Sequence, residues 1–187
     1  SEDQGASECL KCGPGRYSII SSSSSLKNCL ECAPGKISID GSVSCNFCNI
    51  GEWAKNFKEC IKCSNGKYGD SIGLISNNQC KDCLIGYYND EYGITKSEQC
   101  KMCEDGKIGF IVGAISNTTC RSCPAGQFKS DVKSCQTCLK GKISKESSMD
   151  CELCLSGKYS NLYQVECIKC PMGKYNIFDG ASDEDAC

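Results

Sequence analysis

C-R-S-C-P-A-G-Q-F, residues 120–128, is one copy of a phrase that recurs along the whole chain. In each copy a C-x-x-C pair is followed by two variable residues, a glycine, one more residue and a bulky side chain. The phrase occurs ten times, and the glycine keeps its place in all ten copies. Such a repeat has to be recognised before other features are interpreted, because each copy is one structural unit.

The members of the repeat are fixed by position. Twenty of the 21 cysteines form the pairs Cys9/Cys12, Cys29/Cys32, Cys45/Cys48, Cys60/Cys63, Cys80/Cys83, Cys100/Cys103, Cys120/Cys123, Cys135/Cys138, Cys151/Cys154 and Cys167/Cys170. The glycines are Gly15, Gly35, Gly51, Gly66, Gly86, Gly106, Gly126, Gly141, Gly157 and Gly173. The bulky residues are Tyr17, Ile37, Trp53, Tyr68, Tyr88, Ile108, Phe128, Ile143, Tyr159 and Tyr175. The gaps after successive pairs, with Cys187 closing the last, contain 16, 12, 11, 16, 16, 16, 11, 12, 12 and 16 residues.

The composition excludes several classes of protein. Cysteine makes up 21 of 187 residues, a share typical of disulfide scaffolds. The chain has too few aliphatic residues for the single core expected at this length, so we expect covalent crosslinks to replace that core. The net charge of −2 gives no basic footprint for nucleic acid, and no run of about 20 apolar residues forms a membrane span in this segment.

Each repeat predicts a small β-hairpin. The glycine suits a backbone with positive φ, the residues after it favour a strand, and Gly, Asn, Asp and Ser supply a turn before a return strand leads into the next cysteine. Four of the long repeats carry a second glycine seven residues before the closing cysteine (Gly73, Gly93, Gly113 and Gly180), and the fifth has Ser22 there. We therefore expect longer hairpin tips in the long repeats.

The predicted fold class is a small disulfide-rich β fold, an elongated solenoid-like rod of about ten stacked one-disulfide hairpin modules with little or no helix. We expect each bulky residue, Trp53 included, to pack on the disulfide below it, and each module to contact its neighbours. We expect residues 1–11 to be the tail of a preceding module. The modules are 12–31, 32–47, 48–62, 63–82, 83–102, 103–122, 123–137, 138–153, 154–169 and 170–187, numbered 1 to 10.

Two chemistries fit the cysteine spacing. C-x2-C-x16-C-x2-C is compatible with a zinc site, but zinc sites use the pairs two at a time, and the observed gaps do not alternate accordingly. The chain also has no histidine, which is unusual across several zinc sites. Disulfides in an oxidising compartment are the favoured interpretation. A redox role is weaker, because a low-pKa thiol needs a helix N-terminus that these turns do not offer.

The repeat also restricts the pairing of the cysteines. A bond inside C-x-x-C would close only a tight turn, whereas a bond from the second Cys of one pair to the first Cys of the next closes each hairpin. This ladder predicts Cys12–Cys29, Cys32–Cys45, Cys48–Cys60, Cys63–Cys80, Cys83–Cys100, Cys103–Cys120, Cys123–Cys135, Cys138–Cys151, Cys154–Cys167 and Cys170–Cys187. Cys9 is left unpaired within this segment.

The phrase C-x-x-C-x-x-G-x-[Tyr/Phe/Ile] with its downstream cysteine resembles the ephrin-receptor-like cysteine-rich repeat. It is also similar to the one-disulfide module of tumour necrosis factor receptors, to other growth-factor-receptor cysteine-rich regions and to C-x-x-C surface antigens of single-celled eukaryotes. The stretch from Cys120 to Ser144 carries the resemblance most clearly. The resemblance implies modules stacked as a rod with the ladder pairing, and it implies a scaffold rather than a binding residue.

Other signals are local. Asn117-Thr118-Thr119 is an acceptor for N-linked glycosylation, and Ser21–Ser25 is a serine run that favours a solvated tip over O-glycosylation. The clusters Asn89-Asp90-Glu91 and Asp183-Glu184-Asp185 lack a complete calcium-ligand spacing, so solvated turn charge is the favoured interpretation. We expect no bound metal and no cofactor.

We expect no enzymatic activity, because no positioned acid, base or nucleophile is recognisable. The favoured function is an extracellular structural repeat protein, a stalk, fibre or surface coat. The alternatives are a ligand-binding receptor ectodomain or cell-surface antigen built from the same repeats, and an intracellular zinc protein. Expected partners are further copies of the repeat or of the protein itself, and glycans. The expected location is extracellular or at the cell surface, through the secretory pathway.

Both ends of the sequence fall inside the repeat, since Ser1–Glu8 resembles the tail of a module and Cys187 lacks a following x-x-C. We expect a segment of a longer array in which Cys9 pairs with a cysteine upstream. If Ser1 is a mature terminus, we expect Cys9 to form an intermolecular bond instead.

Overall fold

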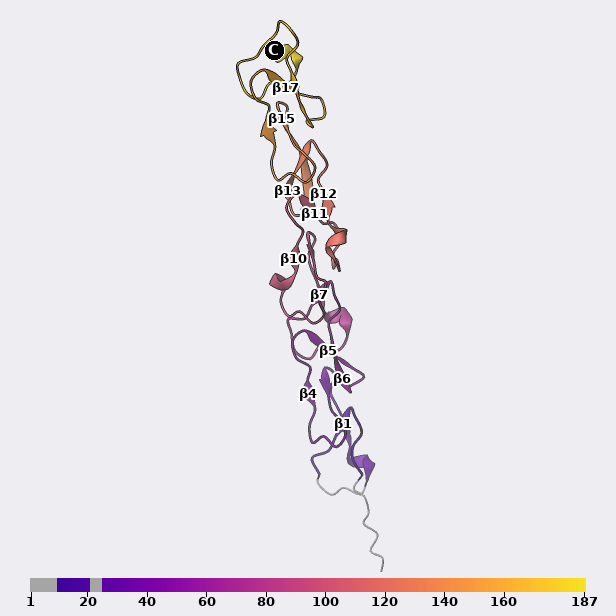
Figure 1. Ribbon diagram of the computed structural model, residues 1–187. Coiled ribbons are helices and arrows are strands. Elements are labelled where there is room, and N and C mark those ends of the chain that lie inside the picture. The colour runs from indigo at the N-terminus through magenta and orange to yellow at the C-terminus, as the bar shows by residue number, and fades with distance from the viewer. Residues whose placement is uncertain (1–9, 21–24) are drawn as a thin grey trace, which may run out of the picture. The chain divides into compact units, whose positions relative to one another are not determined.

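The computed structural model describes residues 10–20 and 25–187 of the chain. Within them the chain forms short antiparallel hairpins and three-residue 3-10 turns, with no α-helix in the described ranges. The chain divides into two compact units, the first comprising Ser1–Asp82 with Asp90–Gln99 and the second Cys83–Asn89 with Cys100–Cys187. Figure 1 shows the hairpins following one another within each unit.

The first unit contains four two-stranded sheets. They pair β1 (Arg16–Tyr17) with β2 (Leu30–Glu31), β3 (Lys36–Ile37) with β4 (Asn46–Phe47), β5 (Glu52–Lys55) with β6 (Glu59–Lys62), and β7 (Lys67–Tyr68) with β8 (Lys81–Asp82). Its 3-10 turns are η1 (Leu26–Asn28), η2 (Asn77–Gln79) and η3 (Ser97–Gln99).

The second unit contains five such sheets. They pair β9 (Tyr87–Tyr88) with β10 (Lys101–Met102), β11 (Lys107–Ile108) with β12 (Arg121–Ser122), β13 (Gln127–Asp131) with β14 (Ser134–Thr137), β15 (Lys142–Ile143) with β16 (Glu152–Leu153), and β17 (Lys158–Ser160) with β18 (Cys167–Lys169). Its 3-10 turns are η4 (Asn117–Thr119) and η5 (Glu184–Ala186).

The return strand lies further along the chain than expected. In module 4, for example, Lys67 pairs with Asp82 and Tyr68 with Lys81, so the return strand is formed by the two residues between the cysteines of the next C-x-x-C pair. The turn η2 precedes that pair and brings Cys80 into position. The two intervening residues of C-x-x-C therefore serve as the strand that closes the hairpin.

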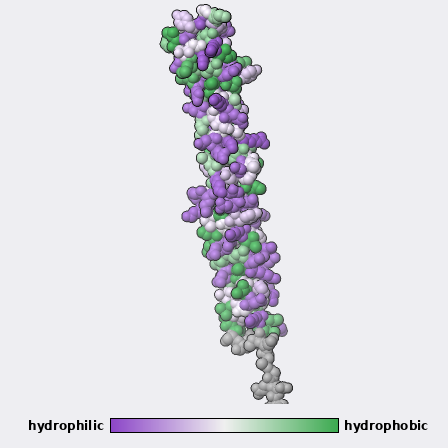
Figure 2. All heavy atoms as spheres, viewed as in Figure 1, coloured by the Kyte–Doolittle hydropathy of each residue, from purple (hydrophilic) through white to green (hydrophobic). Residues whose placement is uncertain are grey.

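The cysteines form the interior of the protein. The second cysteine of every pair from Cys12 to Cys154 is buried, with 0 to 6 % of its surface exposed. Large aliphatic residues lie outside instead; Leu84 and Leu139 are 70 % and 74 % exposed. Figure 2 shows apolar residues interspersed with polar ones over the visible face. Sulfur replaces the aliphatic core that the composition cannot supply.

The predicted fold class is confirmed in its local architecture, small antiparallel hairpins with one disulfide each and ten disulfides in succession. Module 10 differs in detail. It keeps the turn after the cysteine, where the Lys174 N–H donates to the Pro171 carbonyl at 3.0 Å, but its residues form no paired strands.

Candidate functional site: the interface between successive hairpins

The disulfides form a ladder along the chain. Each links the second cysteine of one pair to the first cysteine of the next, with Cα–Cα distances of 5.5 to 6.0 Å and sequence separations of 12 to 17 residues. Each bond joins the first cysteine of a module to the last cysteine of the same module, three residues before the next module begins. The interface between modules is built on these fixed points.

The glycine of the phrase makes the turn that starts each hairpin. In module 4 the Lys67 N–H donates to the Ser64 carbonyl at 3.2 Å, which places Gly66 third in a four-residue turn with a φ of +76°. A positive φ at this position is typical of a type II turn and favours glycine. The equivalent glycines of all ten modules have φ between +70° and +88°.

Successive modules are joined by one recurring backbone hydrogen bond. We call the residue three positions after the phrase glycine the bridging position. Its N–H donates to a tip carbonyl of the next module at 2.8 to 3.2 Å. The nine donor–acceptor pairs are Ser18–Ser42, Ser38–Phe57, Ala54–Leu74, Gly69–Ile94, Asn89–Ala114, Gly109–Val132, Lys129–Ser148, Ser144–Gln164 and Ser160–Ala181.

Side chains at the bridging position add bonds to the preceding module. The hydroxyls of Ser38 and Ser144 donate to the Arg16 and Gln127 carbonyls, both at 2.8 Å. Both serines are 4 % exposed, so a larger side chain would not fit there without displacing the neighbouring hairpin. Apart from Lys129, the bridging residues are Ser, Ala, Gly or Asn in every module. In the sequence the interface is visible as this preference for small residues at the bridging position. The hairpin prediction alone does not explain the preference.

The tip of the hairpin makes a second recurring bond. The Gly73 N–H donates to the carbonyl of Cys48, in the preceding module, at 3.0 Å. The same bond joins Gly41 to Cys12, Gly93 to Cys63, Gly113 to Cys83, Ser147 to Cys123 and Gly180 to Cys154. The second glycine is therefore an interface residue in short modules as well as long ones, with Ser147 in its place in module 8 at a φ of +62°. Ser22 lies outside the described residues.

Contacts also reach the module two places away, one further than expected. A Cβ atom built on Gly35 in module 2 would collide with the backbone carbonyl of Gly73 in module 4. The same collision pairs Gly51 with Gly93, Gly106 with Ser147, Gly126 with Tyr163 and Gly141 with Gly180. In these five modules the phrase glycine is thus required both by its own turn and by the close approach of a distant tip.

Part of the chain is similar to a known family of cysteine-rich repeats. Residues 141–187, about a quarter of the chain, match the family model described as tyrosine-protein kinase ephrin type A/B receptor-like. This segment is similar to the ephrin-receptor-like cysteine-rich repeats. The regular ladder of ten disulfides fits the same repeat family over the rest of the chain. No curated protein matches the chain.

The ephrin-receptor-like repeat is a non-catalytic extracellular module. Ten disulfides belong to the same setting, because they persist in oxidising compartments and are rare in the cytosol. Family and crosslinks together indicate an extracellular receptor-like or repeat protein. No helix in the described part of the chain is long and apolar enough to cross a membrane.

One module departs from the preference for small residues at the bridging position. Lys129 holds the bridging position of module 7 and is 8 % exposed. Its ammonium donates to the carbonyls of Cys103 at 3.1 Å and Glu104 at 3.3 Å. In six other modules a tip N–H makes the bond to the equivalent cysteine carbonyl. The lysine side chain supplies this donor at the junction of modules 6 and 7.

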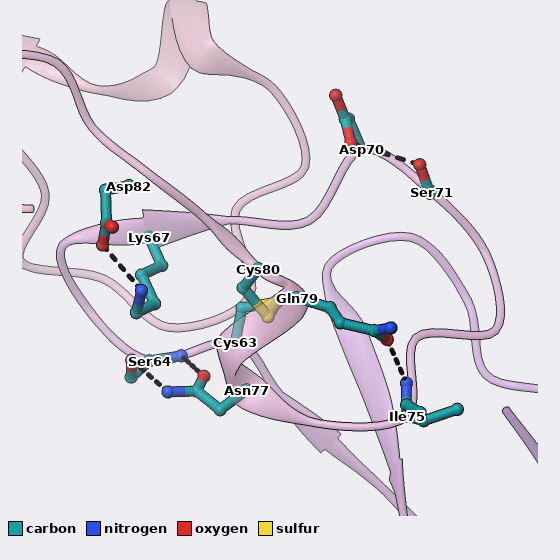
Figure 3. Close-up of a disulfide and its surroundings, with 10 residues drawn as sticks. All are labelled: Cys63, Ser64, Lys67, Asp70, Ser71, Ile75, Asn77, Gln79, Cys80 and Asp82. Atoms are coloured by element: carbon teal, nitrogen blue, oxygen red, sulfur yellow. Dashed lines mark hydrogen bonds and ion pairs between the residues drawn. A yellow bond between two sulfur atoms is a disulfide. The ribbon is translucent and has the colours of Figure 1, made fainter. Parts of the chain in front are cut away.

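Module 4 shows how polar side chains fasten a long hairpin around its disulfide (Figure 3). Asn77 accepts a hydrogen bond from the Ser64 N–H and donates to the Ser64 hydroxyl, both at 3.0 Å. Gln79 accepts from the Ile75 N–H at 2.7 Å. Both side chains come from η2, so they fix this 3-10 turn against the start and the tip of the hairpin beside Cys63–Cys80.

Exposed ion pairs lie on the outside of the hairpins. Lys81 donates to Asp70 at 2.6 Å; this hydrogen bond lowers the pKa of the Asp70 carboxyl and raises the pKa of Lys81. The hydrogen bond from Lys107 likewise lowers the pKa of Glu104. Such solvated pairs contribute little to stability. They belong to the surface of the scaffold and indicate no acid–base chemistry.

The predicted glycosylation site is exposed. Asn117 begins η4, and its side chain forms no hydrogen bond within the described ranges. Asn77 occupies the same place in module 4 but uses its amide to bind Ser64. Thr119, two residues after Asn117, donates its hydroxyl to the Ser116 carbonyl at 2.7 Å.

The other residues singled out in the sequence differ in how far they are buried. The bulky residues of the phrase are half-buried, except Tyr175, which is 74 % exposed. Asn89 is fully buried at a bridging position and so belongs to the framework rather than to a solvated cluster. Cys9 and residues 21–24 of the serine run lie outside the described residues. Ser25 accepts a hydrogen bond from the Lys27 N–H at the start of η1.

The acidic clusters are engaged in local contacts. Asp183 accepts a hydrogen bond from the Ser182 hydroxyl at 2.8 Å, and Glu184 accepts one from Lys174 at 3.4 Å. Within residues 10–20 and 25–187 no group of three or more Cys, Asp or Glu side chains is arranged to hold a metal ion.

Proposed function

We propose that this protein is an extracellular structural repeat protein, a stalk, fibre or surface coat held together by its ladder of disulfides. The observation that carries the proposal is the backbone hydrogen bond that joins the bridging position of one module to the tip of the next at nine successive junctions. Because this bond uses backbone atoms, modules of different sequence stack by the same rule. An array of this kind grows by adding equivalent units.

The side chains support this role. Apart from Lys129 the bridging residues are small, and those of modules 2 to 9 are buried, whereas the residues that face solvent differ from module to module. A scaffold requires constancy at its junctions and tolerates variation outside them. We propose that the partners are further copies of the repeat or of the protein itself, together with glycans, and that the protein acts at the cell surface without catalysis.

Immunogold labelling tests the structural role. Antibodies raised against the purified, non-reduced protein are applied to sections of the cells that produce it. A structural protein gives continuous labelling along a surface layer, stalk or fibre, and reducing agent releases or loosens that material. Labelling confined to the cell interior, or a surface layer that is unchanged by reduction, would contradict the proposal.

A receptor ectodomain or surface antigen is the second candidate, and one observation favours it. At the tip of module 6, Phe110, Ile111 and Val112 are 40 %, 50 % and 53 % exposed, so three apolar side chains in a row face solvent. Module 4, of the same length, has Asp70 at the first of these positions. Discrete surface clusters in the immunogold images, with one distinct protein crosslinked in equal amount, would favour this candidate.

A further inference from the structure

Three successive modules of the first unit form an aromatic groove of about 580 Å³. Trp53 and Ile61 come from module 3 and Tyr92 from the tip of module 5, while Ser64 and Asn77 come from module 4. Lys62 is the one charged residue among those lining the groove. The groove therefore exists only where these modules are stacked, because no single module contributes all of its lining residues.

The walls of the groove are apolar and open to solvent. Trp53 and Ile61 are directly opposite each other in the β5–β6 pair, which places their side chains on one face of the hairpin. Tyr92 is 63 % exposed. Trp53 holds the bulky position of the phrase, yet it contributes an accessible aromatic surface as well as packing. The expectation that Trp53 only packs on the disulfide below it therefore describes one part of its environment.

The polar groups of the groove are mainly hydrogen-bond donors. Ser64 accepts from Asn77 and keeps its own O–H, and Asn77 keeps one of its two amide hydrogens, because the other is used by Ser64 (Figure 3). Lys62 is directly opposite Glu52 in the β5–β6 pair, and its ammonium forms no ion pair within the described ranges. The groove therefore offers a positive charge and free donors beside aromatic faces.

We propose that this groove binds an acidic saccharide, a sugar ring carrying a carboxylate. A pyranose ring presents a face of C–H groups to Trp53 and Tyr92, hydroxyl oxygens to the donors of Ser64 and Asn77, and its carboxylate to Lys62. Ligand sites of this kind combine apolar and aromatic walls with a few placed polar groups.

The geometry favours a saccharide over an extended peptide. A peptide strand binds by adding to an open sheet edge. The edge of β5 beside the groove is already occupied, because the Ala54 N–H donates to the Leu74 carbonyl at 2.8 Å and Trp53 bridges to Leu74. A ligand in the groove therefore binds through side chains, which suits a ring-shaped molecule.

The chain carries its own reporter for the test, because Trp53 is the only tryptophan. The full, non-reduced protein is titrated with sialyllactose, an acidic trisaccharide, and with lactose, its neutral counterpart, while tryptophan fluorescence is recorded. We expect a saturable change with sialyllactose and an affinity for lactose about three- to fivefold lower, as for loss of one exposed ion pair. Added salt should reduce this preference.

Variants separate the contributions. Lys62→Met should bring the affinity for sialyllactose down to that for lactose, and Tyr92→Ala should weaken both sugars by about threefold or more. Tyr163→Ala, a tip tyrosine of the second unit that is 74 % exposed, is the matched control and should change neither affinity. Unchanged amide exchange in the variants shows that the fold is intact.

The proposal is overturned if sialyllactose gives no saturable change, or if Tyr92→Ala binds as well as the wild type. It is also overturned if hexaglutamate, an acidic peptide, competes more tightly than the sugar, or if the fluorescence changes with protein concentration alone, which would place a second copy in the groove. None of these outcomes bears on the structural role of the array, which the immunogold experiment tests separately.

Discussion

The backbone carbonyl of Gly73 occupies the space that a side chain on Gly35 would need. The two glycines lie in modules 2 and 4, so the tip of one hairpin contacts the first turn of the hairpin two modules earlier. Gly35 is therefore a contact between distant modules and not only a turn residue.

Gly35→Ala should destabilise the protein more than Gly157→Ala. Both glycines have a positive φ, +79° and +76°, so each substitution costs about 1–2 kcal/mol of backbone strain. Only at Gly35 does the new Cβ also collide with backbone, since nothing lies within 4 Å of a Cβ at Gly157. Thermal unfolding of the non-reduced variants measures the difference. Equal midpoints would show that the contact between modules 2 and 4 is absent in solution.

Lys129→Met should loosen the junction of modules 6 and 7. The substitution keeps the length of the side chain but removes the donor to the Cys103 carbonyl, at a cost of about 1–3 kcal/mol; the Glu104 carbonyl keeps the bond from the Lys107 N–H. Amide hydrogen exchange should accelerate in these two modules. Lys140→Met, at an exposed lysine, is the control. Identical exchange in both variants would remove the role assigned to the buried ammonium.

Peptide mapping of the non-reduced protein should recover Cys123–Cys135 and its nine counterparts. Replacing both of these cysteines by alanine should destabilise module 7 by about 3 kcal/mol, because the open loop regains entropy in the unfolded state. Metal analysis of the native protein should find no zinc. Fragments joined mainly within C-x-x-C pairs such as Cys120/Cys123 would refute the ladder, and stoichiometric zinc would refute the disulfides.

Asn117 should carry an N-linked glycan when the protein is secreted from eukaryotic cells. Enzymatic deglycosylation should lower the mass of the wild type but not that of Asn117→Gln, which should fold normally because its amide holds no hydrogen bond within the described ranges. Asn77→Gln is the contrasting variant; it should keep the glycan but lose the bonds to Ser64 and unfold more easily. A wild-type mass that is unaffected by deglycosylation would contradict the assignment.

X-ray scattering tests the predicted rod. A compact domain of this length has a radius of gyration of about 16 Å. If the modules stack in one direction through the whole chain, the measured value should lie well above this figure. A value near the compact figure would mean that the modules fold back on one another, and the stalk proposal would lose its support.

The module and its crosslinks could be predicted from the amino-acid sequence. The fixed place of Gly126 after Cys123, repeated in ten copies, was sufficient to predict a glycine turn, a short strand and a closing disulfide. These features are local, since they depend on the φ of one residue and on a loop of 12 to 17 residues, and local constraints leave a regular trace in the sequence.

The contacts between modules are visible only in the folded chain. Two of these contacts use only backbone atoms, which every residue possesses. One is the hydrogen bond from the Ser38 N–H to the Phe57 carbonyl, and the other is the close approach of Gly73 to Gly35. A backbone contact constrains the sequence only by excluding side chains, so it appears as a preference for small residues and does not name its partner. The groove between Trp53 and Tyr92 is likewise invisible in the sequence, because 39 positions separate two residues that only the stacking of modules 3, 4 and 5 places in one groove.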